Sequence, residues 1–132
     1  MNLIDKKLNQ LRDNKELGLI AHAVLGYPTM KKSHEIIKSL ISAGSDFLEL
    51  QIPFSDPMAD GETIMKACEE SLKNGMNTDK AFEMIDSINK TSPQNPSCPI
   101  ILMAYYNTVF RYGLERFCKR AKNLKVAGLI VP

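Results

Sequence analysis

The sequence has 132 residues, of which 44% are apolar and 24% charged, and its formal net charge is +2. This length suits a single domain over residues 1–132 and is too short for two ordinary domains. The small net charge gives no support for a nucleic-acid or membrane-surface partner, and no apolar run reaches the roughly 20 residues that span a bilayer.

The thiol and imidazole side chains are few and widely separated. The cysteines are Cys68, Cys98 and Cys118, an odd number without CxxC spacing, and the two histidines are His22 and His34. No metal site is therefore expected. Reduced thiols, and the lack of a long apolar segment near the N-terminus that would form a secretory signal, predict a cytoplasmic protein.

Short apolar runs alternate with amphipathic segments along the chain. The spacing of apolar residues predicts helices over 3–15, 31–43, 61–74 and 111–123. A further helix is expected to begin at Asn77 or Thr78 and to bury Phe82, Ile85 and Ile88. Apolar runs predict strands over 18–25, 47–52, 100–105 and 126–131, with a polar loop at 91–97.

Two of these elements carry more detailed expectations. The run 18–25 is almost continuously apolar, which is typical of a strand buried on both faces. In the helix predicted over 111–123, the side chains expected to face inward are Leu114, Phe117, Cys118 and Ala121.

The alternation of strands and helices predicts an α/β fold with a parallel sheet and right-handed crossovers. Two architectures fit: an open doubly wound sheet, or about half of a (β/α)8 barrel. In both, the chemistry lies at the C-terminal ends of the strands. Asp60, Tyr106 and Asn107 follow such ends and Glu49 lies in the second half of its strand, so polar side chains gather at the expected edge.

The stretch from Glu49 to Gly61 places carboxylates within and after a short apolar strand. Because side chains alternate along a strand, Glu49 and Gln51 face one way, and Leu48, Leu50 and Ile52 face the other. A carboxyl group on the interior face of a barrel is favoured in its neutral form, which suits a group that both gives and takes a proton. The proline-containing loop that follows would bring Asp60 to the same substrate.

These residues also have structural interpretations. Asp56 and Asp60 would then cap turns or the following helix, and Glu49 would pair with a lysine. His22 would be a core histidine with a backbone partner, and the three cysteines would fill the core. The residue pattern alone leaves these alternatives open.

The run Glu49-Leu50-Gln51-Ile52-Pro53-Phe54-Ser55-Asp56-Pro57-Met58-Ala59-Asp60-Gly61 closely resembles the signature of the tryptophan synthase alpha chain family. The segments 25–28, 102–107 and 128–132 resemble other strand ends of that family. The resemblance implies the N-terminal half of a (β/α)8 TIM barrel, with about the first four β/α units present. It also implies a lyase of tryptophan biosynthesis, which cleaves indole-3-glycerol phosphate to indole and glyceraldehyde 3-phosphate.

The resemblance implies roles for individual residues. Glu49 and Asp60 match the family's catalytic acids. The positions that match the substrate pocket are His22, Met103, Tyr105 and Ile130, and His22 stands where the family often has an aromatic residue. The positions that match the loop contacting a beta chain are Pro53, Phe54, Asp56 and Pro57. That beta chain forms an alpha-beta heterotetramer with the family and carries pyridoxal phosphate, so this chain itself is expected to hold no cofactor.

The sequence departs from the family pattern in several places. Gln51 stands where glycine or a small residue is common, and Glu62 stands where proline is common. The family's phosphate site is built by the second half of the barrel, whereas residues 1–132 cover only the first half. The resemblance therefore predicts that residues 1–132 include the proton-transfer residues but not those that bind the phosphate group of the substrate. The 132 residues alone are expected to be inactive. The alternative is a non-catalytic half-barrel that docks a beta chain or self-associates.

Overall fold

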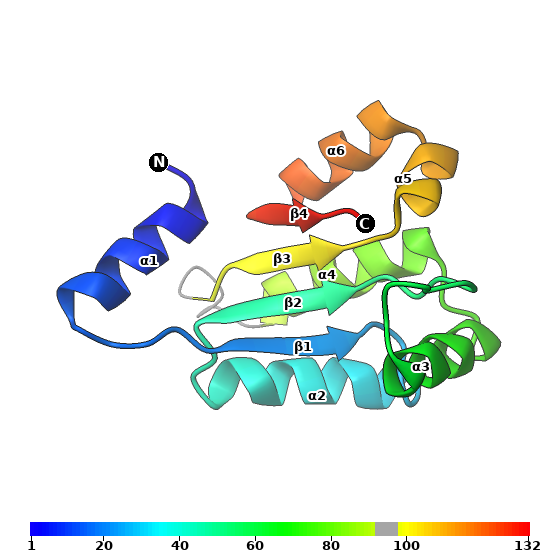
Figure 1. The fold of residues 1–132 in the computed structure, drawn as a ribbon, viewed down its shortest axis with the longest axis horizontal. Coiled ribbons are helices and arrows are strands. Elements are labelled where there is room, and N and C mark those ends of the chain that lie inside the picture. The colour runs from blue at the N-terminus through cyan, green and yellow to red at the C-terminus, as the bar shows by residue number, and fades with distance from the viewer. Residues whose placement is uncertain (92–97) are drawn as a thin grey trace.

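The computed structural model describes residues 1–91 and 98–132, so most of the loop predicted at 91–97 lies outside the described residues. Helices and strands alternate along the chain, as predicted (Figure 1). The helices are α1 (Leu3–Asp13), α2 (Met30–Ser42), α3 (Glu62–Lys73), α4 (Thr78–Thr91), α5 (Tyr106–Tyr112) and α6 (Leu114–Asn123). The strands are β1 (Ile20–Val24), β2 (Phe47–Gln51), β3 (Ile100–Met103) and β4 (Gly128–Ile130).

The strands form one parallel sheet in the order β1-β2-β3-β4. The register places His22 beside Glu49, Glu49 beside Ile101, and Ile101 beside Gly128. Figure 1 shows α1 at the N-terminal ends of the strands, and α3 and α5 at the C-terminal ends. Because parallel strands all end at the same edge, residues that follow β1, β2 and β3 meet there.

Helices α2, α4 and α6 pack on one face of the sheet. Leu48, Leu50 and Ile52 are fully or almost fully buried against apolar residues of α2, α4 and α6. Phe82 of α4 lies at the centre of this core, with its ring centroid 5.1 Å from that of Phe117 in an edge-to-face arrangement. On the opposite face α3 packs only at the C-terminal edge, against Val24. A sheet with its main helix layer on one face is typical of a barrel wall, so the half-barrel prediction is confirmed and the open doubly wound sheet is not what forms.

Local signals explain several helix boundaries. The Asn77 side chain accepts a hydrogen bond of 2.9 Å from the backbone N–H of Lys80, which confirms the predicted cap of α4. The predicted inward residues of this helix, Phe82, Ile85 and Ile88, are all buried. At the end of β1, Gly26 has a φ of +87°, and an added Cβ would come within 2.5 Å of Ser71 Oγ, so only glycine fits there.

The helix predicted over 111–123 is wrong in extent. Two helices occupy this region, because α5 ends at Tyr112 and Gly113, with a φ of +97°, turns the chain before α6 begins at Leu114. Phe117 and Ala121 face inward as predicted, but Leu114 and Cys118 are exposed. Cys118 is therefore not core filler, whereas Cys68 and Cys98 are buried.

The expectation that the first strand is buried on both faces is also wrong. Ala21 and Ala23 pack towards the helix-facing core, but Ile20 is 53% exposed and His22 is exposed as well. β1 is an outer strand of the sheet. On its second face Val24 is buried against Ala67 and Cys68 of α3, whereas Ile20 and His22 are left exposed. An apolar run reports hydrophobicity but cannot report whether both faces are covered.

An ion pair fixes α1 to the N-terminal edge of the sheet. Lys7 Nζ lies 3.0 Å from Asp46 Oδ1, and the other carboxylate oxygen accepts a 2.9 Å hydrogen bond from the backbone N–H of Leu19. The hydrogen bond from Leu19, followed by the contact with Lys7, holds the pKa of Asp46 below its usual value. This edge therefore carries a structural contact between the first helix and the start of the barrel wall.

Candidate active site

Asp60 lies at the C-terminal edge of the sheet, in the loop between β2 and α3. Its Oδ2 atom accepts a 2.9 Å hydrogen bond from Gln51 Nε2 and another of 2.9 Å from the hydroxyl of Tyr105. Its Oδ1 atom accepts no hydrogen bond from the described part of the chain. Since an ionised carboxylate can accept several hydrogen bonds, Oδ1 is available to a ligand donor.

The interpretation in which the Asp60 side chain caps the following helix is wrong. Helix α3 begins after Gly61, which makes no side-chain capping bond, and the Asp60 carboxylate turns back towards β2 and Tyr105 instead. Asp56 behaves differently: it is exposed, and its carboxylate accepts a 2.7 Å hydrogen bond from the hydroxyl of the adjacent Ser55. Asp56 thus takes part in a local turn, as the structural interpretation expects.

Tyr105 ties the loop to the strand ends. Its hydroxyl donates to Asp60 and accepts a 3.0 Å hydrogen bond from the backbone N–H of Ala59, while its ring stacks on Phe54 with 5.1 Å between centroids. Burial raises the pKa of Tyr105, and its hydrogen bond to Asp60 raises it further, so the hydroxyl remains a donor at neutral pH. The contact spans 45 residues of sequence, so the fold alone brings these groups together.

Glu49 lies in the middle of β2 on the face opposite the helix-facing core. It is half-buried and sits beside His22 in β1 and Ile101 in β3. Its carboxylate makes no hydrogen bond or ion pair with any residue in 1–91 or 98–132, so a structural pairing with a described lysine is not present. The carboxyl group is therefore open to the interior face of the barrel wall.

His22 and Gln51 form a second contact on the same face. His22 Nε2 lies 2.9 Å from Gln51 Oε1, although 29 residues separate the two positions. His22 is exposed and its partner is a side chain, so the interpretation of a core histidine with a backbone partner is wrong. Gln51 is 1% exposed. The sequence placed it on the same strand face as Glu49 and marked it as a departure from the family pattern, but gave it no role in the site.

The remaining predicted pocket residues, Met103 and Ile130, lie level with Gln51 across the neighbouring strands β3 and β4. Gln51 pairs laterally with Met103, and Met103 pairs with Ile130. Met103 is buried and Ile130 is 40% exposed. The structure thus brings His22, Gln51, Met103 and Ile130 to one face near the C-terminal edge, beside Asp60.

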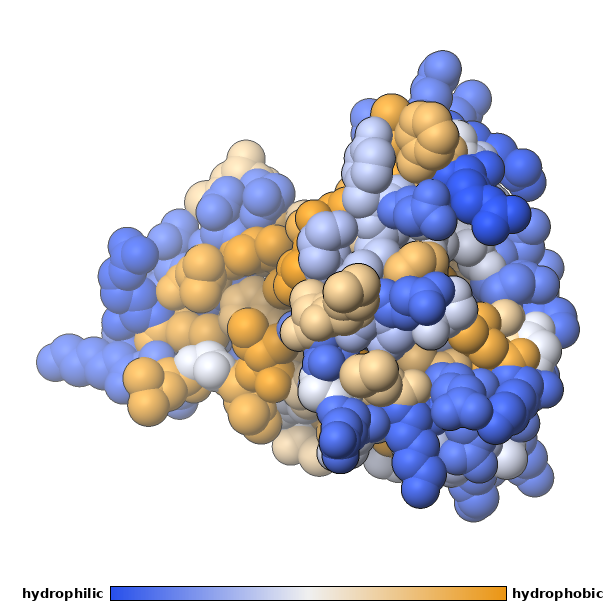
Figure 2. Space-filling model, turned by 45° about the vertical axis from the view of Figure 1, so that its right-hand side comes forward, coloured by the Kyte–Doolittle hydropathy of each residue, from blue (hydrophilic) through white to orange (hydrophobic). Residues whose placement is uncertain are grey.

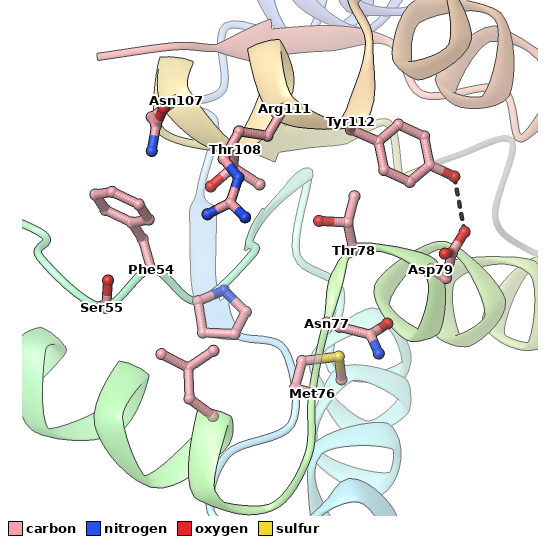
Figure 3. A pocket seen from close by; sticks show the side chains of 12 residues that line it. Phe54, Ser55, Met76, Asn77, Thr78, Asp79, Asn107, Thr108, Arg111 and Tyr112 are labelled. Carbon is pink, nitrogen blue, oxygen red and sulfur yellow. Dashed lines mark hydrogen bonds between the residues drawn. The ribbon is translucent and has the colours of Figure 1, made fainter.

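A separate cavity of about 540 Å³ lies between the start of the loop that carries Asp60, the region where α3 ends and α4 begins, and helix α5 (Figure 3). Pro53 and Phe54 line this cavity, whereas Asp56 and Pro57 do not. Figure 3 shows Asn107, Thr108 and Arg111 of α5 at the top, with Phe54 below Asn107, and it shows Met76 and Asn77 on the opposite side. Sequence reasoning missed the part played by α5, because Tyr106 and Asn107 were expected only to follow a strand end.

Within the described ranges, no three His, Cys, Asp or Glu side chains are placed to hold a metal ion together. Among these same residues, no helix has both the length and the apolar character that crossing a membrane requires.

A parallel barrel wall with carboxyl side chains at its C-terminal edge is the arrangement of a (β/α)8-barrel enzyme. The family model of the tryptophan synthase alpha chain matches residues 8–132. This chain belongs to the tryptophan synthase alpha chain family.

The relatives show how much of the family protein the chain represents. It is 43% identical to the tryptophan synthase alpha chain of Methanosarcina barkeri, over 98% of this chain and 47% of the relative. A solved structure of tryptophan synthase subunit alpha from Legionella pneumophila superimposes with a TM-score of 0.92 at 35% identity, over 99% of this chain and 49% of that chain. A structure of tryptophan synthase from M. tuberculosis, in an aminoacrylate-bound form, gives a TM-score of 0.90 at 28% identity. The chain therefore spans about half the length of the relatives it matches.

Proposed function

We propose that the protein is a lyase of the tryptophan synthase alpha type, which cleaves indole-3-glycerol phosphate to indole and glyceraldehyde 3-phosphate. The observation that carries this proposal is the state of Asp60. Two neutral donors hold Oδ2, and Oδ1 accepts nothing from the described residues. A carboxylate fixed in this way suits an N–H group that gains positive charge during a reaction, as the ring nitrogen of an indole would.

Glu49 and Asp60 would divide the proton chemistry. Glu49 donates a proton to carbon 3 of the indole ring while Asp60 accepts the hydrogen bond of the ring N–H. Glu49 then takes the proton of the side-chain hydroxyl. The bond between carbon 3 and the side chain breaks, its electron pair restores the aromatic ring, and the former hydroxyl carbon leaves as an aldehyde.

The interior face of the barrel wall would hold the indole ring. His22, Met103, Tyr105 and Ile130 are the proposed contacts, and the exposure of Ile130 is consistent with a surface that a ligand covers. Residues 1–132 are proposed to form a single domain, the N-terminal half of a TIM barrel, without a cofactor or metal. Because the family's phosphate site belongs to the second half, these residues alone would lack the positioning that provides much of the catalysis.

A beta chain carrying pyridoxal phosphate is the proposed partner, in a cytoplasmic complex. Pro53 and Phe54, which line the cavity of about 540 Å³, and Asp56 and Pro57, which extend the same loop, would contact it. One loop would thus carry both Asp60 and the docking surface.

The exposed apolar surface supports a second candidate, a half-barrel that associates through its open face without catalysis. In Figure 2, apolar side chains extend across the left and centre of the molecule. Large exposed apolar residues occur near both outer strands, namely Leu17, Leu19, Ile20, Leu129, Ile130 and Val131. Exposed edges and apolar area of this kind favour association.

An assay of indole release separates the two candidates. It compares the 132-residue chain and a form long enough to complete the barrel, each with and without a beta chain. We expect cleavage by the longer form, stimulation by the beta chain, and no cleavage by residues 1–132 alone. Cleavage by neither form, together with a stable oligomer in size-exclusion chromatography, would instead support the non-catalytic half-barrel.

A further inference from the structure

The side chain of Gln51 connects two residues of the candidate site that do not touch each other. Its Nε2 atom donates to Asp60 Oδ2 at 2.9 Å, and its Oε1 atom lies 2.9 Å from His22 Nε2. Nε2 also lies 3.7 Å from Cys68 Sγ, a weak acceptor. Burial raises the pKa of the Cys68 thiol, so this neighbour stays neutral. Every polar atom of a side chain only 1% exposed therefore has a partner.

The charge of Asp60 determines which way the Gln51 amide points. An ionised carboxylate only accepts hydrogen bonds, so the amide must turn its NH2 group to Asp60 and its carbonyl oxygen to His22. The reversed amide would place a carbonyl oxygen against a carboxylate oxygen in a buried position, which is costly. Tyr105 adds a second donor to the same carboxylate oxygen and so reinforces this assignment.

The orientation of Gln51 in turn determines the state of His22. A carbonyl oxygen only accepts, so His22 must donate from Nε2. In the neutral imidazole the other nitrogen, Nδ1, is then an acceptor. Nδ1 makes no hydrogen bond with the described residues, and His22 is exposed and lines a cavity of about 220 Å³ along β1, where a ligand could reach it.

We propose that Gln51 is a positioning residue of this site, which fixes the Asp60 carboxylate and the Nε2–H tautomer of His22 together. The consequence for catalysis rests on the proposed function, whereas the tautomer does not. Held in this way, His22 presents an acceptor, which fits a ligand hydroxyl and disfavours a carbonyl or phosphate oxygen. The hydroxylated side chain of the proposed substrate belongs to the favoured class.

Other side chains at position 51 would not reproduce this connection. Methionine has a similar length but neither donates nor accepts strongly, so both hydrogen bonds would be lost. Glutamate keeps an acceptor for His22 but brings a second carboxyl group against Asp60. Gln10, which is exposed on α1, offers a matched control because the same change to methionine there touches neither partner.

The first experiment determines the tautomer of the His22 imidazole and requires no enzymatic activity. Long-range ¹H–¹⁵N spectra of the labelled protein report which ring nitrogen carries the proton, and His34, bonded to Ser87, serves as an internal reference. We expect Nε2–H at His22, with a proton protected enough from exchange to be observed. Gln51→Met should abolish that protected signal, whereas Gln10→Met should retain it. An Nδ1–H tautomer in the wild type, or an unchanged signal in Gln51→Met, overturns the proposal.

A change at Asp60 tests whether its charge reaches His22 through Gln51. In Asp60→Asn, position 60 both donates and accepts, so the Gln51 amide loses its single orientation and the His22 signals should become a mixture. The same change in the Gln51→Met background should leave His22 unaffected. If Gln51→Met does not fold, Gln51→Glu replaces it, and retention of the His22 Nε2–H signal there is the expected result. An unchanged His22 spectrum in Asp60→Asn overturns the connection.

Turnover in a form long enough to complete the barrel tests the catalytic consequence. Gln51→Met should lower kcat by about 10- to 100-fold, as expected when a catalytic group is misplaced, with a smaller change in KM. Gln10→Met should match the wild type. Full turnover in Gln51→Met would overturn the positioning role. If the wild type itself releases no indole, the proposed function fails, and the spectra still decide the role of Gln51.

Discussion

Asp46 at the N-terminal edge of the sheet and Asp60 at the C-terminal edge each have two partners, but of different kinds. Asp46 uses both oxygens, one for the Lys7 ammonium group and one for the backbone N–H of Leu19. Asp60 receives neutral donors, Gln51 and Tyr105, on one oxygen only. Both oxygens of the first carboxylate have a partner and hold a helix in place, whereas Oδ1 of the second accepts no hydrogen bond from the described residues. In (β/α)8 barrels the N-terminal end serves stability and the C-terminal end chemistry, and we propose the same division for these two residues.

Glu49→Gln should have the largest effect on activity. The amide cannot give and take a proton, so turnover should fall by about 10³-fold in a form that completes the barrel. Thermal unfolding should change little, because the Glu49 carboxylate makes no hydrogen bond with the described residues. Turnover like that of the wild type would show that Glu49 takes no part in the mechanism. It would also contradict the assignment of the C-terminal edge as the site of chemistry.

Asp60→Asn should rank second. An amide can still accept from Tyr105, so the loop should remain folded, but the loss of negative charge should lower turnover by about 10²-fold. Circular dichroism tests whether the variant is folded, and indole release from the same sample measures its turnover. If the variant unfolds, Asp60 is structural like Asp46, and the contrast between the two edges disappears.

Tyr105→Phe sharpens the assignment of the C-terminal edge. The change deletes the hydroxyl that donates to Asp60 and accepts from Ala59, while the stacking on Phe54 remains. We expect a loss of about 1 kcal/mol in unfolding free energy, typical of one hydrogen bond, and a reduction in turnover smaller than that of Asp60→Asn. Tyr106→Phe is the control, because Tyr106 is exposed. Equal effects of the two changes would contradict a specific role for Tyr105.

The sequence predicted the barrel wall well because its signals are local. Alternating apolar residues in 47–52 define the two faces of β2, and Asn77 marks the start of α4 by its capping preference. Helix α5 escaped detection because 7 residues directly after a strand are too few to show a periodic pattern. The exposed face of β1 escaped because an apolar run looks the same whether or not a neighbour covers it.

The hydrogen-bonded network of the site lay beyond sequence reasoning for a different reason. Its contacts join residues 29 and 45 positions apart, and no local spacing encodes them. Gln51 could have been suspected, since strand alternation places an amide on the same face as Glu49. What the amide binds depends on the path of the loop to Asp60, which only the folded chain defines.

Asp46→Asn should have the smallest effect on activity and a measurable effect on stability. The Lys7 contact is lost, while an amide oxygen can still accept from Leu19, so unfolding free energy should fall by about 1 kcal/mol at neutral pH. Because folding lowers the pKa of Asp46, its contribution is present above the ordinary aspartate pKa of about 4 and is lost as the pH falls through the lowered value. The stability difference between wild type and variant should therefore be constant from pH 7 to about 4 and shrink below that. Asp13→Asn, an exposed change at the end of α1, is the control and should show no comparable difference in unfolding free energy. If the difference between wild type and Asp46→Asn persisted at the lowest pH, the charge of Asp46 would not be what anchors α1.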